Sequence, residues 1–158
     1  FGLAQELGID RAIAKICIDT YFAKYPLIKD CLDNIKTQAR HNGYVETVFG
    51  RKIYLNNINA SNRILREAEE RLALNAPMQG TCADVIKIAM INISKWLKAN
   101  NLVTKIVLQV HDELILLTPE TEVDIVTKNL ARLMSDGMEL SVKLSVDIRT
   151  AQNWDEAH

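Results

Sequence analysis

Three ionisable residues, His111, Asp112 and Glu113, stand together between two apolar runs of the sequence. The flanking segments, residues 103–110 and 113–117, both favour β-strand, and only His111 and Asp112 separate them. A two-residue hairpin turn would hold the Asp112 carboxylate on a rigid platform, where it could bind Mg²⁺ together with substrate phosphates. Glu113 is a second acidic residue beside it, and His111 could donate a hydrogen bond to a phosphate or to a strand terminus. The alternative is a polar turn that is exposed to solvent and binds nothing.

A second candidate group lies in residues 70–81, which read ERLALNAPMQGT. Arg71 and Asn75 are four residues apart and therefore share one face of a helix. Gln79 follows Pro77, in what the sequence predicts to be the first turn of a new helix. Side chains of these types can donate hydrogen bonds to adenine N3 and thymine O2 along the DNA minor groove, which tests the shape of a base pair more than its sequence. The alternative is a solvated helix face with a capped break.

A third group lies in residues 43–54, GYVETVFGRKIY, whose strand-forming residues and Gly50 predict a small hairpin. Arg51 and Lys52 follow the turn, with Tyr44 close by. Basic and aromatic side chains together suit phosphates and stacked bases. An exposed hairpin with scattered charge explains the composition equally well.

The elements that position these residues follow from capping residues and periodicity. Asp10 can cap a helix over residues 11–25, and a second helix begins near Pro26 and ends at Gly43. Pro77 lacks a backbone N–H, so we expect it to separate one helix ending near Asn75 from the next. A further helix over residues 119–134 and a last strand over residues 144–148 complete the order. This order predicts an α+β fold, with an antiparallel sheet covered on one face by helices.

Composition narrows the class of protein. Apolar residues make up 48% and charged residues 25%, which is typical of a globular domain. Residues 1–102 carry 14 basic and 10 acidic side chains and residues 103–158 carry 5 and 10, so balances of +4 and −5 give the net charge of −1. The three cysteines have no metal-ligand or redox spacing, and we expect them to be buried in a reducing compartment. No apolar run is long enough to span a membrane. We expect a cytoplasmic protein, and an opening Phe1 in place of Met suggests a fragment.

Two motifs together resemble family A DNA polymerases. These are RLALNAPMQGTCADVIKIAM at residues 71–90 and LQVHDEL at residues 108–114. The opening FGLAQELGI and the closing NWDEAH are also similar to that family, so the resemblance covers essentially the whole chain. It implies that residues 1–71 belong to a mainly helical fingers portion and residues 72–158 to a palm portion with an antiparallel palm-type sheet.

The resemblance also implies a role for each matching residue. Asp112 would be a ligand of catalytic Mg²⁺, with Glu113 as its acidic neighbour and His111 near the primer terminus. Arg71, Asn75 and Gln79 would contact primer and template close to the insertion site. The implied partners are primer–template DNA, deoxynucleoside triphosphates and an upstream part of the same chain. Two Mg²⁺ ions would serve the phosphoryl transfer.

Two motifs of the family are absent from the 158 residues. No segment like DYSQIE supplies the other metal-binding aspartate, and no helix like KxxxxxxYG supplies the Lys and Tyr that hold the nucleotide. We therefore expect the chain by itself to be inactive. The alternative from another class is a non-catalytic DNA-binding module or a degenerate polymerase relative. A metal-dependent nuclease would need several clustered carboxylates, which the sequence does not supply outside Asp112 and Glu113.

Overall fold

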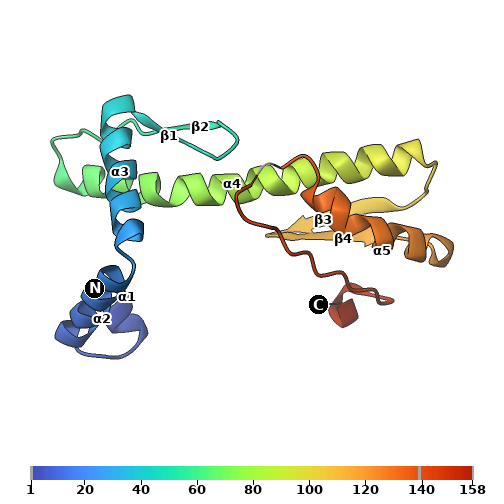
Figure 1. Ribbon diagram of the computed structural model, residues 1–158, viewed down its shortest axis with the longest axis horizontal. Helices are drawn as coiled ribbons and strands as arrows, with labels where there is room; N and C mark the ends of the chain where they lie inside the picture. The colour runs from blue at the N-terminus through green and yellow to red at the C-terminus, as the bar shows by residue number, and fades with distance from the viewer. Residues whose placement is uncertain (1, 139, 158) are drawn as a thin grey trace. The chain divides into compact units, whose positions relative to one another are not determined.

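The computed structural model describes residues 2–138 and 140–157 (Figure 1). Helices and short antiparallel hairpins make up the fold, as the sequence predicts. In chain order the elements are α1 (Gly2–Glu6), α2 (Arg11–Lys24), α3 (Pro26–Asn42), β1 (Tyr44–Glu46), β2 (Lys52–Tyr54), α4 (Arg63–Ala99), β3 (Lys105–Val110), β4 (Glu113–Leu117), α5 (Glu120–Ser135) and α6 (Trp154–Ala157). No helix of the described residues combines the length and the apolar character needed to cross a membrane.

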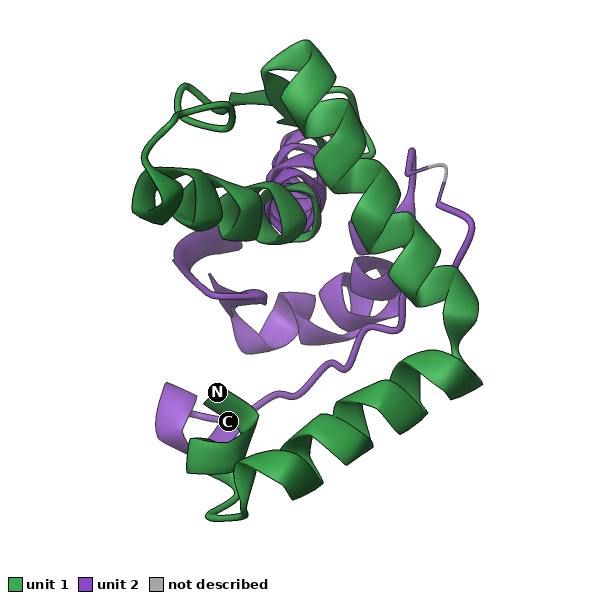
Figure 2. Cartoon of the chain, turned by 90° about the vertical axis from the view of Figure 1, so that its left-hand side faces the viewer, with its two compact units in different colours: residues 1–78 green, residues 79–158 purple. Residues whose placement is uncertain are grey.

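The chain divides into two compact units, unit 1 from Phe1 to Met78 and unit 2 from Gln79 to His158 (Figure 2). The division falls inside α4, so the first part of this helix belongs to unit 1 and the second part to unit 2. Each unit has its own core of buried apolar side chains.

The start of α2 and both ends of α3 lie where their capping residues predict. The Asp10 side chain caps α2 by accepting a hydrogen bond of 2.7 Å from the Ala12 backbone N–H. Pro26 is the first residue of α3, and Gly43 ends that helix in the left-handed conformation at φ 75°. β1 and β2 then pair in the predicted hairpin, with Val45 opposite Ile53.

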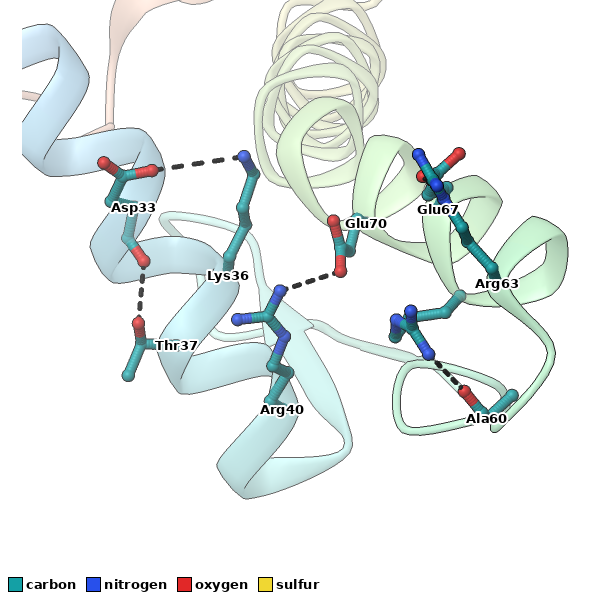
Figure 3. Close-up of polar contacts among 9 residues, drawn as sticks. Asp33, Lys36, Thr37, Arg40, Ala60, Arg63, Glu67 and Glu70 are labelled. Atoms are coloured by element: carbon teal, nitrogen blue, oxygen red, sulfur yellow. Dashed lines mark hydrogen bonds and ion pairs between the residues drawn. The ribbon is translucent and has the colours of Figure 1, made fainter.

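The unit 1 core joins α3, the hairpin and the first part of α4. Its buried residues are Ala39, Val45, Leu55, Ile58, Ala73 and Ala76. A polar contact at its surface connects two of these elements, because Arg40 of α3 lies 2.7 Å from the Glu70 carboxylate of α4 (Figure 3). Arg40 also holds the pKa of the Glu70 carboxyl below its usual value through this hydrogen bond. Arg66 of α4 donates to the Ala60 carbonyl in the loop that precedes this helix.

The predicted break at Pro77 is wrong, because α4 continues through it from Arg63 to Ala99. Proline removes the hydrogen bond that its N–H would make to the Ala73 carbonyl, at a cost of about 3 kcal/mol in a helix interior. Ala73 and Ala76 are both buried in the unit 1 core, and packing of this kind outweighs local propensity. Gln79 therefore lies in the helix interior and not in a first turn.

Unit 2 contains the second hairpin, β3–β4, and helices α4 and α5 cover one face of it. β3 and β4 pair antiparallel and lie beside α5 (Figure 1). Ile106, Leu114 and Leu116 of the hairpin pack against a buried cluster from α4 and α5, which comprises Ile93, Leu97, Val126, Leu130 and Leu133. This arrangement confirms the α+β class and the sheet covered on one face.

Two further predictions about this fold are wrong. Residues 144–148 form no strand, although Leu144, Val146 and Ile148 are half-buried in alternation and Ile148 packs against the unit 2 cluster. A strand needs a neighbouring strand for its backbone hydrogen bonds, and none of the described residues pairs with this segment. All three cysteines are exposed and not buried, since they lie on outward faces of α2, α3 and α4.

Candidate active site and nucleic-acid interface

The turn between β3 and β4 has the geometry that the sequence predicts. Val110 pairs with Glu113, so only His111 and Asp112 lie in the turn. His111 adopts φ 51°, in the left-handed region that costs a non-glycine residue about 1–2 kcal/mol. Histidine visits this region more readily than most residues, but a glycine would occupy it without strain. The turn is therefore held in place by its surroundings and not by its own propensity.

One side-chain hydrogen bond supports this turn directly. The Gln109 amide Nε2 donates to the His111 carbonyl oxygen at 2.7 Å. Farther along the hairpin, Leu114 and Leu116 anchor β4 to the unit 2 cluster. The reasoning from sequence did not single out Gln109, and the signal that could have marked it was an amide side chain within an apolar strand.

The carboxylates of the turn are accessible. Asp112 and Glu113 are both exposed, so their charged forms carry no burial cost. No group of three or more His, Cys, Asp or Glu side chains suited to a metal ion occurs within residues 2–138 and 140–157. The two adjacent carboxylates fit Mg²⁺, which binds through one or two protein carboxylates plus substrate phosphates and retained waters. They do not form an all-protein metal cage.

The second predicted group, Arg71, Asn75 and Gln79, consists of residues of α4. Arg71 and Asn75 lie in unit 1 and Gln79 lies in unit 2, and all three side chains are exposed. Ala73 and Ala76 are buried in the unit 1 core, whereas Arg71 and Asn75 are exposed to solvent. Arg71 and Asn75 are thus four residues apart within a continuous stretch of helix, as the sequence indicated.

Arg71 differs from the other arginines of the described chain. Arg40, Arg63 and Arg132 pair with carboxylates, Arg66 donates to a backbone carbonyl, and Arg11, Arg51 and Arg149 also have partners. Among the described residues, no side chain or carbonyl accepts a hydrogen bond from Arg71. Its guanidinium, with donors in a planar fork, is therefore open to an external acceptor.

The β1–β2 hairpin presents the third group. The Lys52 Nζ lies 4.3 Å from the centroid of the Tyr44 ring and 3.9 Å from a Glu46 oxygen. Its hydrogen bond with Tyr44 is the main cause that raises the pKa of Lys52 above 10.5. Arg51 stands next to it, and its backbone N–H and carbonyl both bond Thr47 across the turn. The hairpin therefore holds a cation and an aromatic ring together at the surface.

Glu122 of α5 is an anchor that the reasoning from sequence missed. Its carboxylate accepts hydrogen bonds from the Thr104 hydroxyl and from the backbone N–H groups of Val103 and Thr104, where β3 begins. The Thr104 hydroxyl is the main cause that lowers the pKa of Glu122. The helix dipole favours acidic residues such as Glu120 and Glu122 in the first turn of α5, but no local pattern indicates that Glu122 bonds a segment 18 residues earlier in the chain.

Comparison with known proteins identifies the family. A sequence profile of DNA polymerase family A matches residues 1–156. The chain belongs to DNA polymerase family A. This finding confirms the resemblance based on the motifs at residues 71–90 and 108–114.

Relatives in this family are similar along the whole chain. DNA polymerase I of Pseudomonas aeruginosa is 45% identical over 158 residues, and DNA polymerase I of Caldicellulosiruptor bescii is 46% identical over 156 residues. These alignments cover 100% and 99% of this chain but only 17% and 18% of the relatives. Among solved structures, the POL domain of Pol1 from M. smegmatis, in complex with DNA primer-template and dNTP, matches with a TM-score of 0.95 and 42% identity, over 99% of this chain and 28% of that one.

Proposed function

We propose that this chain supplies part of the catalytic centre of a DNA-directed DNA polymerase, which adds deoxynucleotides to a primer 3′ end. The observation that carries the proposal is the His111–Asp112 turn, which presents an exposed carboxylate pair on a hairpin anchored to the unit 2 core, in a chain of family A. The solved relative that holds primer-template and dNTP supports the same substrates for this chain.

Asp112 binds a catalytic Mg²⁺ ion in this proposal, and Glu113 supports it. Bound Mg²⁺ neutralises phosphate charge and favours the ionised primer hydroxyl during transfer. Asp112 and Glu113 give two carboxylates at most, so the second ion needs carboxylates from elsewhere in the polymerase. His111 lies beside Asp112 and donates to a phosphate near the primer terminus.

The exposed donors of α4 contact the DNA. Arg71, Asn75 and Gln79 lie outward on the helix, and their donors suit minor-groove acceptors that are common to all correctly formed base pairs. Arg51, Lys52 and Tyr44 of the first hairpin bind the phosphate backbone and a stacked base. Because such contacts do not read base identity, they suit an enzyme that must copy every sequence.

The assignment of residues to the fingers and the palm follows the resemblance to the family. We propose that residues 1–71 belong to the fingers and residues 72–158 to the palm, and that an upstream part of the same polymerase supplies the nucleotide-binding Lys and Tyr and the other aspartate. In this proposal the polymerase acts on primer–template DNA in a bacterial-type cytosol. The 158 residues alone lack these groups, so they do not extend a primer.

The test is primer extension by the longer polymerase chain, with Asp112→Asn compared with Asp124→Asn. Asp124 is an exposed carboxylate on α5, so Asp124→Asn removes the same charge at a position outside the proposed site. We expect Asp112→Asn to slow single-nucleotide incorporation at least about a hundredfold while primer–template affinity is kept. Full incorporation by Asp112→Asn would refute the proposal. A longer chain that binds primer–template but never incorporates a nucleotide would identify a DNA-binding module instead.

A further inference from the structure

We propose that Gln109 is a positioning residue for the His111–Asp112 turn. Its side-chain amide holds the His111 carbonyl, and through the backbone it sets the direction of the Asp112 carboxylate. The inference rests on the proposed function to the extent that Asp112 is taken as the metal ligand. Gln109 lies inside the motif LQVHDEL, but neither the apolar pattern nor the resemblance to the family gave it a role.

A bulge in β3 brings Gln109 to its position. Ile106 pairs with Leu116, but Leu108 pairs with Ile115, so Val107 is an extra residue in β3. Residues that face each other across an antiparallel pair lie on the same side of the sheet. Gln109 is opposite Leu114, and it therefore shares the side on which Leu114 and Leu116 meet the helices. Without Val107 as an extra residue, strict alternation would place Gln109 on the other side from Ile106.

The conformation of His111 explains what this hydrogen bond does. A non-glycine residue at φ 51° is strained, and it leaves this region unless its neighbours hold it. The 2.7 Å bond from Gln109 ends on the carbonyl of the peptide unit that joins His111 to Asp112. Rotation of that peptide unit would break the bond and turn the Asp112 side chain. The bond therefore restricts the motion that would misdirect the carboxylate.

Precise direction matters for the ion that Asp112 binds. Mg²⁺ requires nearly ideal octahedral geometry, and a ligand that is displaced by about 1 Å gives a poor site. Because Asp112 and Glu113 form no group of three or more possible metal ligands with other described residues, no third protein ligand from these residues can compensate. Loss of the Gln109 bond is therefore expected to weaken the response to Mg²⁺ more than the affinity for DNA.

The first test uses the longer polymerase chain with Gln109→Leu, which keeps the size of the side chain and removes the donor. The matched control is Gln38→Leu, the same exchange at an exposed position of α3. We expect the Mg²⁺ concentration for half-maximal incorporation to rise about fivefold in Gln109→Leu, as expected for one lost hydrogen bond, with primer–template affinity unchanged. In the metal-free protein, hydrogen exchange over residues 108–117 should also be about fivefold faster. The control should change neither quantity.

The second test is a double-mutant cycle with His111→Gly. Glycine occupies positive φ without strain, so a turn with glycine at 111 needs the Gln109 bond less. We expect Gln109→Leu to change the half-saturating Mg²⁺ concentration less than twofold in the His111→Gly background. An equal fivefold effect in both backgrounds would overturn the inference, as would a loss of DNA affinity at an unchanged Mg²⁺ response, which would mean that Gln109 contacts DNA directly.

Asp112→Asn separates failure of this inference from failure of the proposed function. If Asp112→Asn stops incorporation while Gln109→Leu changes neither the Mg²⁺ response nor hydrogen exchange, only the role of Gln109 is wrong. If Asp112→Asn leaves incorporation intact, the proposed function itself is wrong, whatever Gln109 does to the turn.

Discussion

Replacing Ile93 by alanine tests whether the unit 2 core holds the hairpin that carries Asp112. Ile93 is fully buried, at 0% exposure, within α4. Its cluster also contains residues of α5, and Leu114 and Leu116 of β4 pack against the same cluster. A cavity at Ile93 should therefore loosen the support of β4 as well as destabilise the unit.

The size of the effect follows from burial. Isoleucine to alanine removes three carbon groups, and about 0.8 kcal/mol for each gives about 2.4 kcal/mol of lost transfer free energy. The cavity that remains adds to this, so the expected loss in the free energy of unfolding is about 3–4 kcal/mol. Ile91 provides the matched control, because it lies two residues earlier in the same helix and is 52% exposed. Ile91→Ala should cost less than about 1 kcal/mol.

Urea unfolding followed by tryptophan fluorescence measures both variants. Trp96 packs against the unit 2 cluster, and Trp154 is replaced by phenylalanine so that the emission reports Trp96 alone. We expect a large drop in the urea midpoint for Ile93→Ala and a small one for Ile91→Ala. The slope of the free energy of unfolding against urea concentration should be similar for both variants. Equal shifts of the midpoint for the two variants would show that the cluster does not carry the stability assigned to it.

Two further perturbations test the electrostatics of the two units. Glu122 has a lowered pKa in the folded chain, so it stabilises the fold above its unfolded pKa and loses this effect as pH falls through the folded pKa. The urea midpoints of wild type and Glu122→Gln should therefore differ at pH 7 and converge as pH falls below 4.5; a constant difference would contradict the assigned hydrogen bonds. Arg71→Ala in the longer chain should weaken primer–template binding by about 1.5–3 kcal/mol, because one charged donor to minor-groove acceptors is lost. Arg63→Ala, whose guanidinium is engaged by Glu67, should weaken primer–template binding less, and the reverse order would argue against the role of Arg71.

The features that the sequence predicted correctly depend on neighbours in the chain. Asp10 caps the helix that follows it by bonding a backbone N–H two residues away, and Gly43 ends α3 because a positive φ costs glycine nothing. The turn at His111 and Asp112 is also local, since two apolar runs separated by two residues leave the chain little choice but a hairpin. That Arg71 and Asn75 share one face of a helix follows from their spacing in the same way.

The wrong predictions concern features that distant residues decide. Pro77 by itself is a helix breaker, but the burial of Ala73 and Ala76 against α3 and the first hairpin keeps α4 continuous. Residues 144–148 have the alternation of a strand, but strand formation also needs a partner edge, which no pattern within the segment can supply. In each case the local signal was real, and long-range contacts determined the result.

The His111–Asp112 turn depends both on local sequence and on pairing with a neighbouring strand. The turn has no Asn-Gly or Asp-Gly, the pairs that two-residue hairpin turns favour, so turn propensity alone does not explain its residues. The structure suggests a reason: His111 is held at positive φ, and Gln109 bonds its carbonyl. The extra residue Val107 shifts the alternation of β3 by one and so decides on which side of the sheet Gln109 lies. All residues of β3 are apolar except Lys105 and Gln109, so no change in polarity marks the bulge. The side of the sheet on which Gln109 lies therefore follows only from the pairing with β4.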